Sequence, residues 1–272
     1  MPGTWLKVDS PAIDVGKNSA VTELLDLADN DRIYNETVDL SAYESTWRLT
    51  VRNTADARTG SFRKAVADSI SGGIVDFDAS LDGQTIALAS VVAIDKSLTV
   101  DASELSNGIV LSGDGVTRVL ETTGSDNTGA STGFTVAEGM PTEDGGGDDG
   151  GGGGDGGGGT TITFTGLTIA DGMTTKDGGG AVLIKSGSVS FDRCAFDGNR
   201  TSGSGGALSQ NTGFVSLTNC LFQDNAAVNG GAAHFNGRIT AVNSAFAGNH
   251  ASTHGGAIYA DAGAASRASR LI

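Results

Sequence analysis

The sequence predicts an all-β solenoid, a parallel β-helix, and three regularities support this prediction. A Gly-Gly-Ala triplet occurs four times in the C-terminal half, at intervals of 25 or 26 residues. A Phe-x-x-Asn motif occurs three times between the triplets, and apolar residues spaced two apart precede it. Self-similarity at a fixed period of this size is typical of repeat architectures, in which each repeat forms one structural unit.

Each repeat has the apolar pattern of one coil of short strands. In the first repeat the apolar positions are Val189, Phe191, Cys194 and Phe196. Alternate apolar residues predict a strand with one buried face, and the change of spacing between Phe191 and Cys194 predicts a bend between two strands. The same spacing occurs 27 residues earlier, over 162–169, and adds another coil. Coils stacked about 4.8 Å apart bury a continuous core that no single coil could bury alone.

The glycines of the triplets are predicted to form turns between strands. A glycine pair before a strand suits a backbone with positive φ, where a Cβ atom would clash. The four pairs are Gly179-Gly180, Gly205-Gly206, Gly230-Gly231 and Gly255-Gly256. Their regular spacing places the same turn at the same corner of every coil.

The asparagines of the Phe-x-x-Asn motif, Asn199, Asn225 and Asn249, occupy one position in successive coils. Asparagine tolerates a left-handed backbone, and stacked side-chain amides can form a ladder of hydrogen bonds. We therefore expect these residues to form a structural ladder. A ligand site built on the amides is the alternative.

The predicted core stack contains Phe196, Phe222 and Phe246, together with Cys194 and Cys220. The two cysteines take the same inward position in adjacent coils, and stacking brings their Cα atoms within disulfide range. Side chains stacked on parallel strands point the same way, however. We therefore predict free, buried thiols, with a disulfide as the alternative.

The composition of the chain limits its partners. Thirty-two acidic residues against 17 basic ones give a net charge of −15. Phosphate binding needs a basic face, so nucleic acid is excluded as a predicted partner, and an anionic membrane surface is disfavoured for the same reason. No apolar stretch approaches the 18 residues of a transmembrane helix, and residues 1–7 lack the apolar region of a signal peptide.

The chain divides into an unassigned segment over 1–46, with one short amphipathic helix, and a β-helix over 47–263. Residues 49–51 are predicted to form a strand. Residues 61–70 are predicted to form an amphipathic helix, which begins at Ser61 and covers the exposed first coil. Its expected apolar face consists of Phe62, Ala65, Val66, Ser69 and Ile70.

Residues 73–139 alternate short apolar runs with turns, and predict two or three irregular coils. The strands expected there are 74–77, 85–88, 91–94, 97–100, 109–111, 118–120 and 134–136. Residues 143–159 contain twelve Gly, four Asp and one Glu, and predict a disordered acidic loop extruded from the solenoid. A calcium nonapeptide would need an apolar residue that this tract lacks, so calcium binding is not supported.

Residues 264–272 break the repeat pattern. Ala265 and Arg267 take the places that Val189 and Phe191 hold in the earlier coil. We therefore expect an irregular tail. We hypothesise from this break that the chain is a truncated piece of a longer, exported protein.

The alternation of the two motifs resembles the repeats of polymorphic outer-membrane proteins, a family of surface-displayed, autotransporter-like proteins. The resemblance is carried by Gly205-Gly-Ala-Leu208 and Phe222-Gln-Asp-Asn225. The segments Val51-Arg-Asn-Thr-Ala-Asp56 and Gly60-Ser-Phe-Arg-Lys-Ala-Val66 are similar to the CSLREA-type segment, which opens many bacterial and archaeal β-helix surface proteins. Together these resemblances cover about residues 49–263. They imply a right-handed parallel β-helix, export and a cell-surface or secreted location, and they carry no catalytic motif.

Three functions fit such a fold. The first, which we favour, is a cell-surface or secreted scaffold that presents its walls to a glycan or protein on a host or environmental surface. It requires no catalytic residue, metal ion or cofactor. The second is a carbohydrate-active enzyme, either a polysaccharide lyase or a glycoside hydrolase. The third is a fragment with no function of its own.

An enzyme of this kind needs paired carboxylates on one wall, or calcium-bound carboxylates with an Arg or Lys base. The candidates are Asp192, Asp197, Asp224, Arg193 and Arg200. Asp197 and Asp224 stand at different offsets from their phenylalanines, so we expect solvated turns rather than a catalytic set. His234, His250 and His254 flank glycine turns without the spacing of a metal site, and are expected to be exposed.

Overall fold

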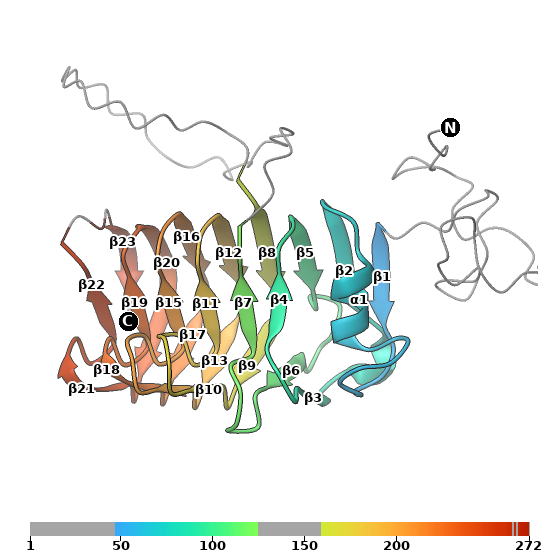
Figure 1. Cartoon of the computed structure of the whole chain (residues 1–272), viewed down its shortest axis with the longest axis horizontal. Helices are drawn as coiled ribbons and strands as arrows, with labels where there is room; N and C mark the ends of the chain where they lie inside the picture. The colour runs from blue at the N-terminus through green and yellow to red at the C-terminus, as the bar shows by residue number, and fades with distance from the viewer. Residues whose placement is uncertain (1–46, 125–158, 263, 265, 272) are drawn as a thin grey trace, which may run out of the picture.

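The computed structural model describes residues 47–124, 159–262, 264 and 266–271. The helix expected within 1–46, the strand expected over 134–136 and nearly all of the acidic tract lie outside these residues. The described chain coils around one axis, and equivalent strands of successive coils lie side by side along it (Figure 1). Neighbouring strands pair in parallel throughout, so the predicted parallel β-helix is confirmed.

A complete coil passes through four strand positions, called walls A to D here in the order of the chain. Wall A contains β1 (Arg48–Val51), β2 (Gly73–Phe77), β5 (Leu98–Asp101), β8 (Thr161–Thr165), β12 (Ser188–Asp192), β16 (Phe214–Thr218), β20 (Arg238–Ala247) and β23 (Ser266–Leu271). Wall B contains β3 (Thr85–Ala87), β6 (Ile109–Ser112), β9 (Leu167–Ala170), β13 (Ala195–Asp197), β17 (Leu221–Gln223) and the second half of β20.

The other two walls complete the coil. Wall C is short and contains β10 (Met173–Thr174), β14 (Arg200–Thr201), β18 (Ala226–Asn229) and β21 (His250–His254). Wall D contains β4 (Val92–Ile94), β7 (Leu120–Thr122), β11 (Val182–Ile184), β15 (Leu208–Gln210), β19 (Ala233–Phe235) and β22 (Ile258–Ala260). Wall C is absent from the coils before β10 among the described residues, because those coils turn directly from wall B to wall D.

The register between coils keeps apolar residues in inward columns. Val189 pairs with Val215 on one side and with Ile162 on the other, and all three are fully buried. The alternate position carries Ser190, which pairs with Ser216 on the outer face. Period-2 alternation therefore holds along each strand, as expected for a sheet with one buried face.

Stacked phenylalanines form the centre of the core. The ring centroids of Phe196 and Phe222 lie 4.4 Å apart, and those of Phe222 and Phe246 lie 4.8 Å apart, with nearly parallel planes. A second stack joins Phe164 and Phe191 at 5.0 Å. Burial of one phenylalanine side chain contributes about 1.5–3 kcal/mol, so these columns are a major source of stability along the axis.

The predicted N-terminal helix is present as α1 (Phe62–Asp68). The Ser61 hydroxyl accepts a hydrogen bond from the Lys64 amide at 3.3 Å and so caps the helix. Arg63 donates to the Val91 carbonyl at 2.9 Å, which fixes the helix beside the first strand of wall D (Figure 1). The Phe62 ring stacks on Phe77 of β2 at 6.1 Å and covers that end of the core.

The expectation that Ile70 lies on the buried face of this helix is wrong, since 47% of the residue is exposed. The helix ends at Asp68, and Ser69 has an extended backbone with φ −61° and ψ 145°. The helical spacing on which the expectation rests therefore stops before Ile70. The first strand of wall A, β1, precedes the helix in the chain and pairs in parallel with β2, which follows the helix.

The irregular coils between β2 and β7 follow the predicted strands closely, with one exception. A strand was expected over 118–120, whereas β7 begins at Leu120. Arg118 instead turns its almost buried side chain towards the next coil. Its guanidinium donates to the carbonyls of Gly178 and Gly179 at 3.0 and 2.9 Å, and pairs with Glu121 at 2.9 Å. The carbonyls of that glycine turn therefore have a charged partner in the preceding coil.

The long segment between β7 and β8 does not interrupt the stack. β8 pairs directly with β5, and Leu98 and Val100 face Ile162 and Phe164. Similarly, β11 pairs with β7 on wall D. Wall D of one coil and wall A of the next therefore keep their regular places on both sides of this segment.

The expectation of an irregular tail after Gly263 is wrong. Residues 266–271 form β23, which pairs in parallel with β20. Ser266 stands opposite Ile239 and Ala268 opposite Ala241, so the register differs by one residue from the alignment that placed Ala265 and Arg267 inward. Ser266 and Ala268 lack large apolar side chains, which explains why the hydrophobic pattern did not indicate a strand.

Both cysteines are free and buried, as predicted. Each is 2% exposed, and the thiols lie 3.5 Å and 3.4 Å from the carbonyl oxygens of Phe164 and Phe191 in the preceding coils. Burial raises the pKa of Cys194 from 9.0 to about 12 and that of Cys220 to about 11. The reactive thiolate is therefore suppressed in the folded chain.

We expect both thiols to resist a thiol-specific reagent in the native protein and to react fully in urea. The unfolded thiols lose their protons near pH 9.0, whereas the folded ones keep theirs. The free energy of unfolding should therefore fall as the pH rises from about 9 towards about 12. The double variant Cys194→Ala/Cys220→Ala should lose this part of the pH dependence. Rapid labelling of native protein would contradict the expectation.

Candidate functional site

The three motif asparagines line one interior corner, between walls B and C. Asn199 and Asn225 are fully buried. The Asn225 side-chain oxygen accepts from both the backbone and side-chain N–H of Asn199 at 3.0 Å, and the Asn249 oxygen accepts in the same way from Asn225 at 3.1 and 2.9 Å. Each amide also donates to a carbonyl of the preceding coil, such as Phe196. The amides are thus engaged in the ladder and turned away from any external ligand.

The left-handed backbone lies one residue before each asparagine, not at the asparagine as expected. Gly198, Asp224 and Gly248 have φ values of 64°, 52° and 63°. This turn orients the following amide into the interior, where it meets the next coil. Asn199 also accepts from the Gly172 amide at 2.8 Å, so the ladder begins at a glycine that has no side chain to offer.

The two glycines of each triplet have different roles. The first glycine has positive φ, from 59° at Gly230 to 75° at Gly179, which supports the proposed turn. In the first three triplets the second glycine lies against the backbone of the next coil. A Cβ atom at Gly206 would meet the Ala226 amide nitrogen at 2.6 Å. The motif therefore needs one glycine for conformation and one for close approach.

Asp192 and Arg193 belong to a second, exposed ladder at the corner between walls A and B. Arg193 donates to Asp192 at 3.0 Å. The other Asp192 oxygen accepts from the Asn219 amide at 3.3 Å, and Asn219 in turn accepts from Asn243 at 2.7 Å. These contacts occupy the carboxylate, and the residues that pair with Asp192 in the two neighbouring coils are Thr165 and Thr218. The expectation of a solvated turn fits this geometry.

Asp197 and Asp224 do approach each other, although their spacing from phenylalanine differs. The pKa of Asp197 is raised by partial burial, then by the charges of Asp224 and Asp171. Asp171 was not among the sequence candidates. It follows β9 directly and has the same left-handed backbone as Asp224, with φ 50°. Asp171 directly precedes Gly172, just as Asp224 directly precedes Asn225. A comparison of the residues before each ladder position, instead of distances from the phenylalanine, would therefore have identified Asp171.

Asp197→Asn should stabilise the protein at neutral pH by about 0.5 kcal/mol, because it removes a partly buried charge and the repulsion that Asp224 and Asp171 exert on it. The free energy of unfolding should increase, because the raised pKa of Asp197 means that the fold disfavours its charged form. The gain should shrink as the pH falls and vanish in thermal unfolding well below pH 3.8, where the carboxyl is neutral in both the folded and the unfolded state. Asp192→Asn, which loses an ion pair, serves as the control and should show no gain. A neutral or destabilising Asp197→Asn would refute the assignment.

The histidines do not form one site. His234 is not exposed as expected, because it lies on β19 with its ring stacked on Tyr259 at 5.5 Å and its Nε2 atom 3.1 Å from an Asp261 oxygen. His254 is exposed and contacts the Asn229 side-chain oxygen at 3.1 Å. Among the residues that the structure describes, no three His, Cys, Asp or Glu side chains are grouped to hold a metal ion. In that same part of the chain, no helix is long and apolar enough to cross a bilayer.

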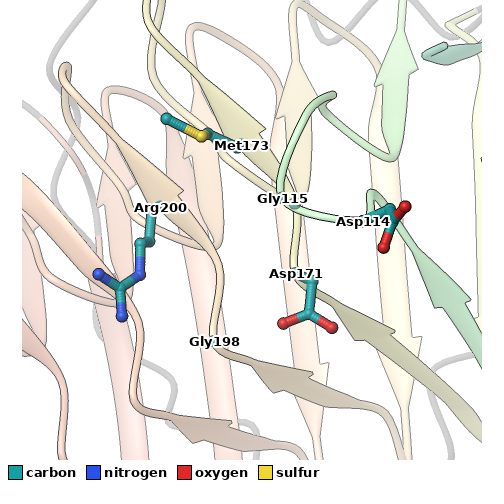
Figure 2. A pocket seen from close by; sticks show the side chains of 7 residues that line it. Asp114, Gly115, Asp171, Met173, Gly198 and Arg200 are labelled. Carbon is teal, nitrogen blue, oxygen red and sulfur yellow. The ribbon is translucent and has the colours of Figure 1, made fainter. Parts of the chain in front are cut away.

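The external feature with the most varied chemistry is a groove across wall C. Two adjoining cavities of about 320 and 310 Å³ share Met173 and Arg200. The first reaches Asp114 and Asp171, and the second extends to residues of β18 and β21. Figure 2 shows Asp114, Asp171 and Arg200 on three neighbouring coils around the first cavity. Of the sequence candidates, only Arg200 lines this groove.

Comparison with protein-family models, with curated proteins and with solved structures gives no match for this chain. The function is therefore inferred from the geometry of the walls and from the repeat motifs.

Proposed function

We propose that this chain is a cell-surface or secreted β-helix module, which acts as a structural and adhesive scaffold without catalysis. The observation that carries the proposal is the unbroken interior ladder of Asn199, Asn225 and Asn249 beside the stacked phenylalanines. Stacked columns of this kind make a long, rigid wall, and a rigid wall can bind a partner without a large ordering cost.

The location is part of the proposal. The repeats resemble those of polymorphic outer-membrane proteins, and the segment around α1 resembles the CSLREA-type segment of exported β-helix proteins. A net charge of −15 agrees with a protein that stays dispersed in solution and avoids nucleic acid. The partner would be a glycan or protein on a host or environmental surface, and neither requires a cofactor.

A carbohydrate-active enzyme is the second candidate, and one observation favours it. The raised pKa of Asp197 beside Asp224 and Asp171 is the property that a general acid needs. Against this, the three carboxylates are exposed at the corners of three successive coils, and the exposed Arg200 hydrogen-bonds through its backbone N–H to the Gly172 carbonyl, which does not position its guanidinium as a base. We therefore retain the scaffold as the leading proposal.

Retention of the full chain on immobilised surfaces tests the proposal. Beads would be coated with neutral polysaccharides, acidic polysaccharides or extracellular-matrix proteins, and assayed with and without calcium. The proposal predicts saturable retention on at least one coating, with the coating left intact. Absence of retention on every coating would contradict the adhesive function.

A further inference from the structure

We propose that the groove across wall C binds a neutral, extended polysaccharide, lying parallel to the solenoid axis. This inference rests on the proposed adhesive function and assigns it a site and a class of ligand. The site is defined by Asp114, Asp171, Met173, Arg200 and Val228.

The length and direction of the groove suit a linear polymer. Its lining runs from Asp114, between β6 and β7, to Ser252 on β21, and so crosses five successive coils. Four steps of about 4.8 Å between strands give a groove of about 19 Å. That length accommodates a few linked sugar rings, whereas a single small molecule would leave most of it empty.

The polar groups of the groove are available to a ligand. Asp171 and Arg200 are exposed, and neither side chain has a hydrogen bond or ion pair with another residue in the described part of the chain. Carboxylates accept hydrogen bonds from sugar hydroxyls, and a guanidinium donates to hydroxyl and ring oxygens. The second cavity adds the exposed hydroxyl residues Thr175 and Ser252, beside Ser202, whose hydroxyl donates to the Thr175 carbonyl at 2.9 Å.

The apolar groups of the groove complement the C–H faces of sugar rings. Met173 is 40% exposed, unusually open for this side chain, and lies where the two cavities join. Val228 and Ala226 on β18 continue the apolar strip in the second cavity. A flexible thioether adapts to irregular apolar surfaces, and sites of mixed apolar and polar lining are typical of ligand grooves.

The charges disfavour an anionic polymer. The groove carries both signs, with Asp114 and Asp171 at one end and Arg200 at its middle. The pKa of neighbouring Asp197 is raised mainly by burial and further by the charges of Asp224 and Asp171, which make the local field beside the groove negative. With a net charge of −15 over the whole chain, a polyanion would be repelled along most of its length.

Affinity electrophoresis of the full chain tests this assignment. Native gels would contain xylan, mannan, polygalacturonate or an unfolded polypeptide such as casein. We expect a neutral polysaccharide to retard the wild-type chain. The double variant Asp171→Asn/Arg200→Gln should weaken the association constant at least tenfold, while its melting temperature does not fall, because Asp171→Asn also relieves repulsion of Asp197. Arg238→Gln, an exposed arginine on wall A, is the matched control and should leave retardation intact.

The other possible outcomes contradict either the location of the binding site or the class of ligand, and these two cases can be distinguished. Equal retardation of the wild type and the double variant would place binding elsewhere, and would leave the adhesive function standing. Retardation by polygalacturonate alone or by casein alone would contradict the neutral-polysaccharide assignment. If neither xylan nor mannan retards the chain, the assignment of the groove to a neutral polysaccharide is wrong. The adhesive function is contradicted only if the bead assay is also negative.

Discussion

Replacing Gly206 by alanine is expected to destabilise the solenoid by more than about 4 kcal/mol, the largest effect among the changes considered. A Cβ atom at this position would lie against the Gly231 carbonyl oxygen, and 2.6 Å and 2.8 Å from the backbone nitrogen and oxygen of Ala226. All three atoms belong to the next coil, so no side-chain rotation relieves the clash. The coils would have to separate, and the hydrogen bonds between them would weaken with the core.

Gly256→Ala is the matched control for this change. Gly256 is the second glycine of the last triplet, and a Cβ atom there would find its nearest neighbour, the Asn249 oxygen, at 3.9 Å. Its expected cost is within about 0.5 kcal/mol. Urea unfolding monitored by circular dichroism would measure both variants. Similar midpoints for Gly206→Ala and the wild type would show that the second glycine is not required for close approach of the coils.

Asn225→Ala is expected to cost about 3 kcal/mol, because it removes the central rung of the interior ladder. The buried backbone N–H of Asn199 loses its acceptor at 3.0 Å, and the Phe196 carbonyl loses a donor at 3.0 Å. An unsatisfied buried polar group costs about 1–3 kcal/mol, and water cannot replace the amide without opening the corner. The same urea titration measures the loss.

The exposed ladder provides the comparison for this variant. Asn243→Gly removes an exposed amide that donates to Asn219 at 2.7 Å, and keeps the left-handed backbone, with φ 49°. Its expected effect stays within about 0.5 kcal/mol. If the two variants lost similar amounts of stability, burial would not be the reason that the interior ladder matters.

The repeats made the fold predictable because each apolar column occurs in several coils. Val189 has an apolar equivalent in the coil before it and in the coil after it, and this agreement between coils excludes a chance pattern. The helix α1 was predictable for a local reason, the Ser61 cap followed by apolar residues at helical spacing. Its end was less predictable, because nothing in the apolar pattern marks the break at Ser69.

The remaining features depend on contacts between coils that a single repeat does not display. Arg118 looked like part of a strand, but its side chain is used by the glycine turn of the next coil. The residues of β23 that pair with Ile239 and Ala241 are Ser266 and Ala268, so hydrophobicity did not reveal the strand. Asp171 approaches Asp197 only because the turns of adjacent coils superpose. Such effects follow from register, which the sequence pattern specifies only where several apolar residues repeat.

The measurement that tests binding without catalysis most directly is release of soluble sugars from a polysaccharide that retains the chain. Reducing ends and unsaturated products would be followed for the wild type and for Asp197→Asn, with and without calcium. The scaffold account predicts retention with no product above the protein-free background in either protein. Product released by the wild type and lost in Asp197→Asn would contradict it, and would assign the row of carboxylates to catalysis.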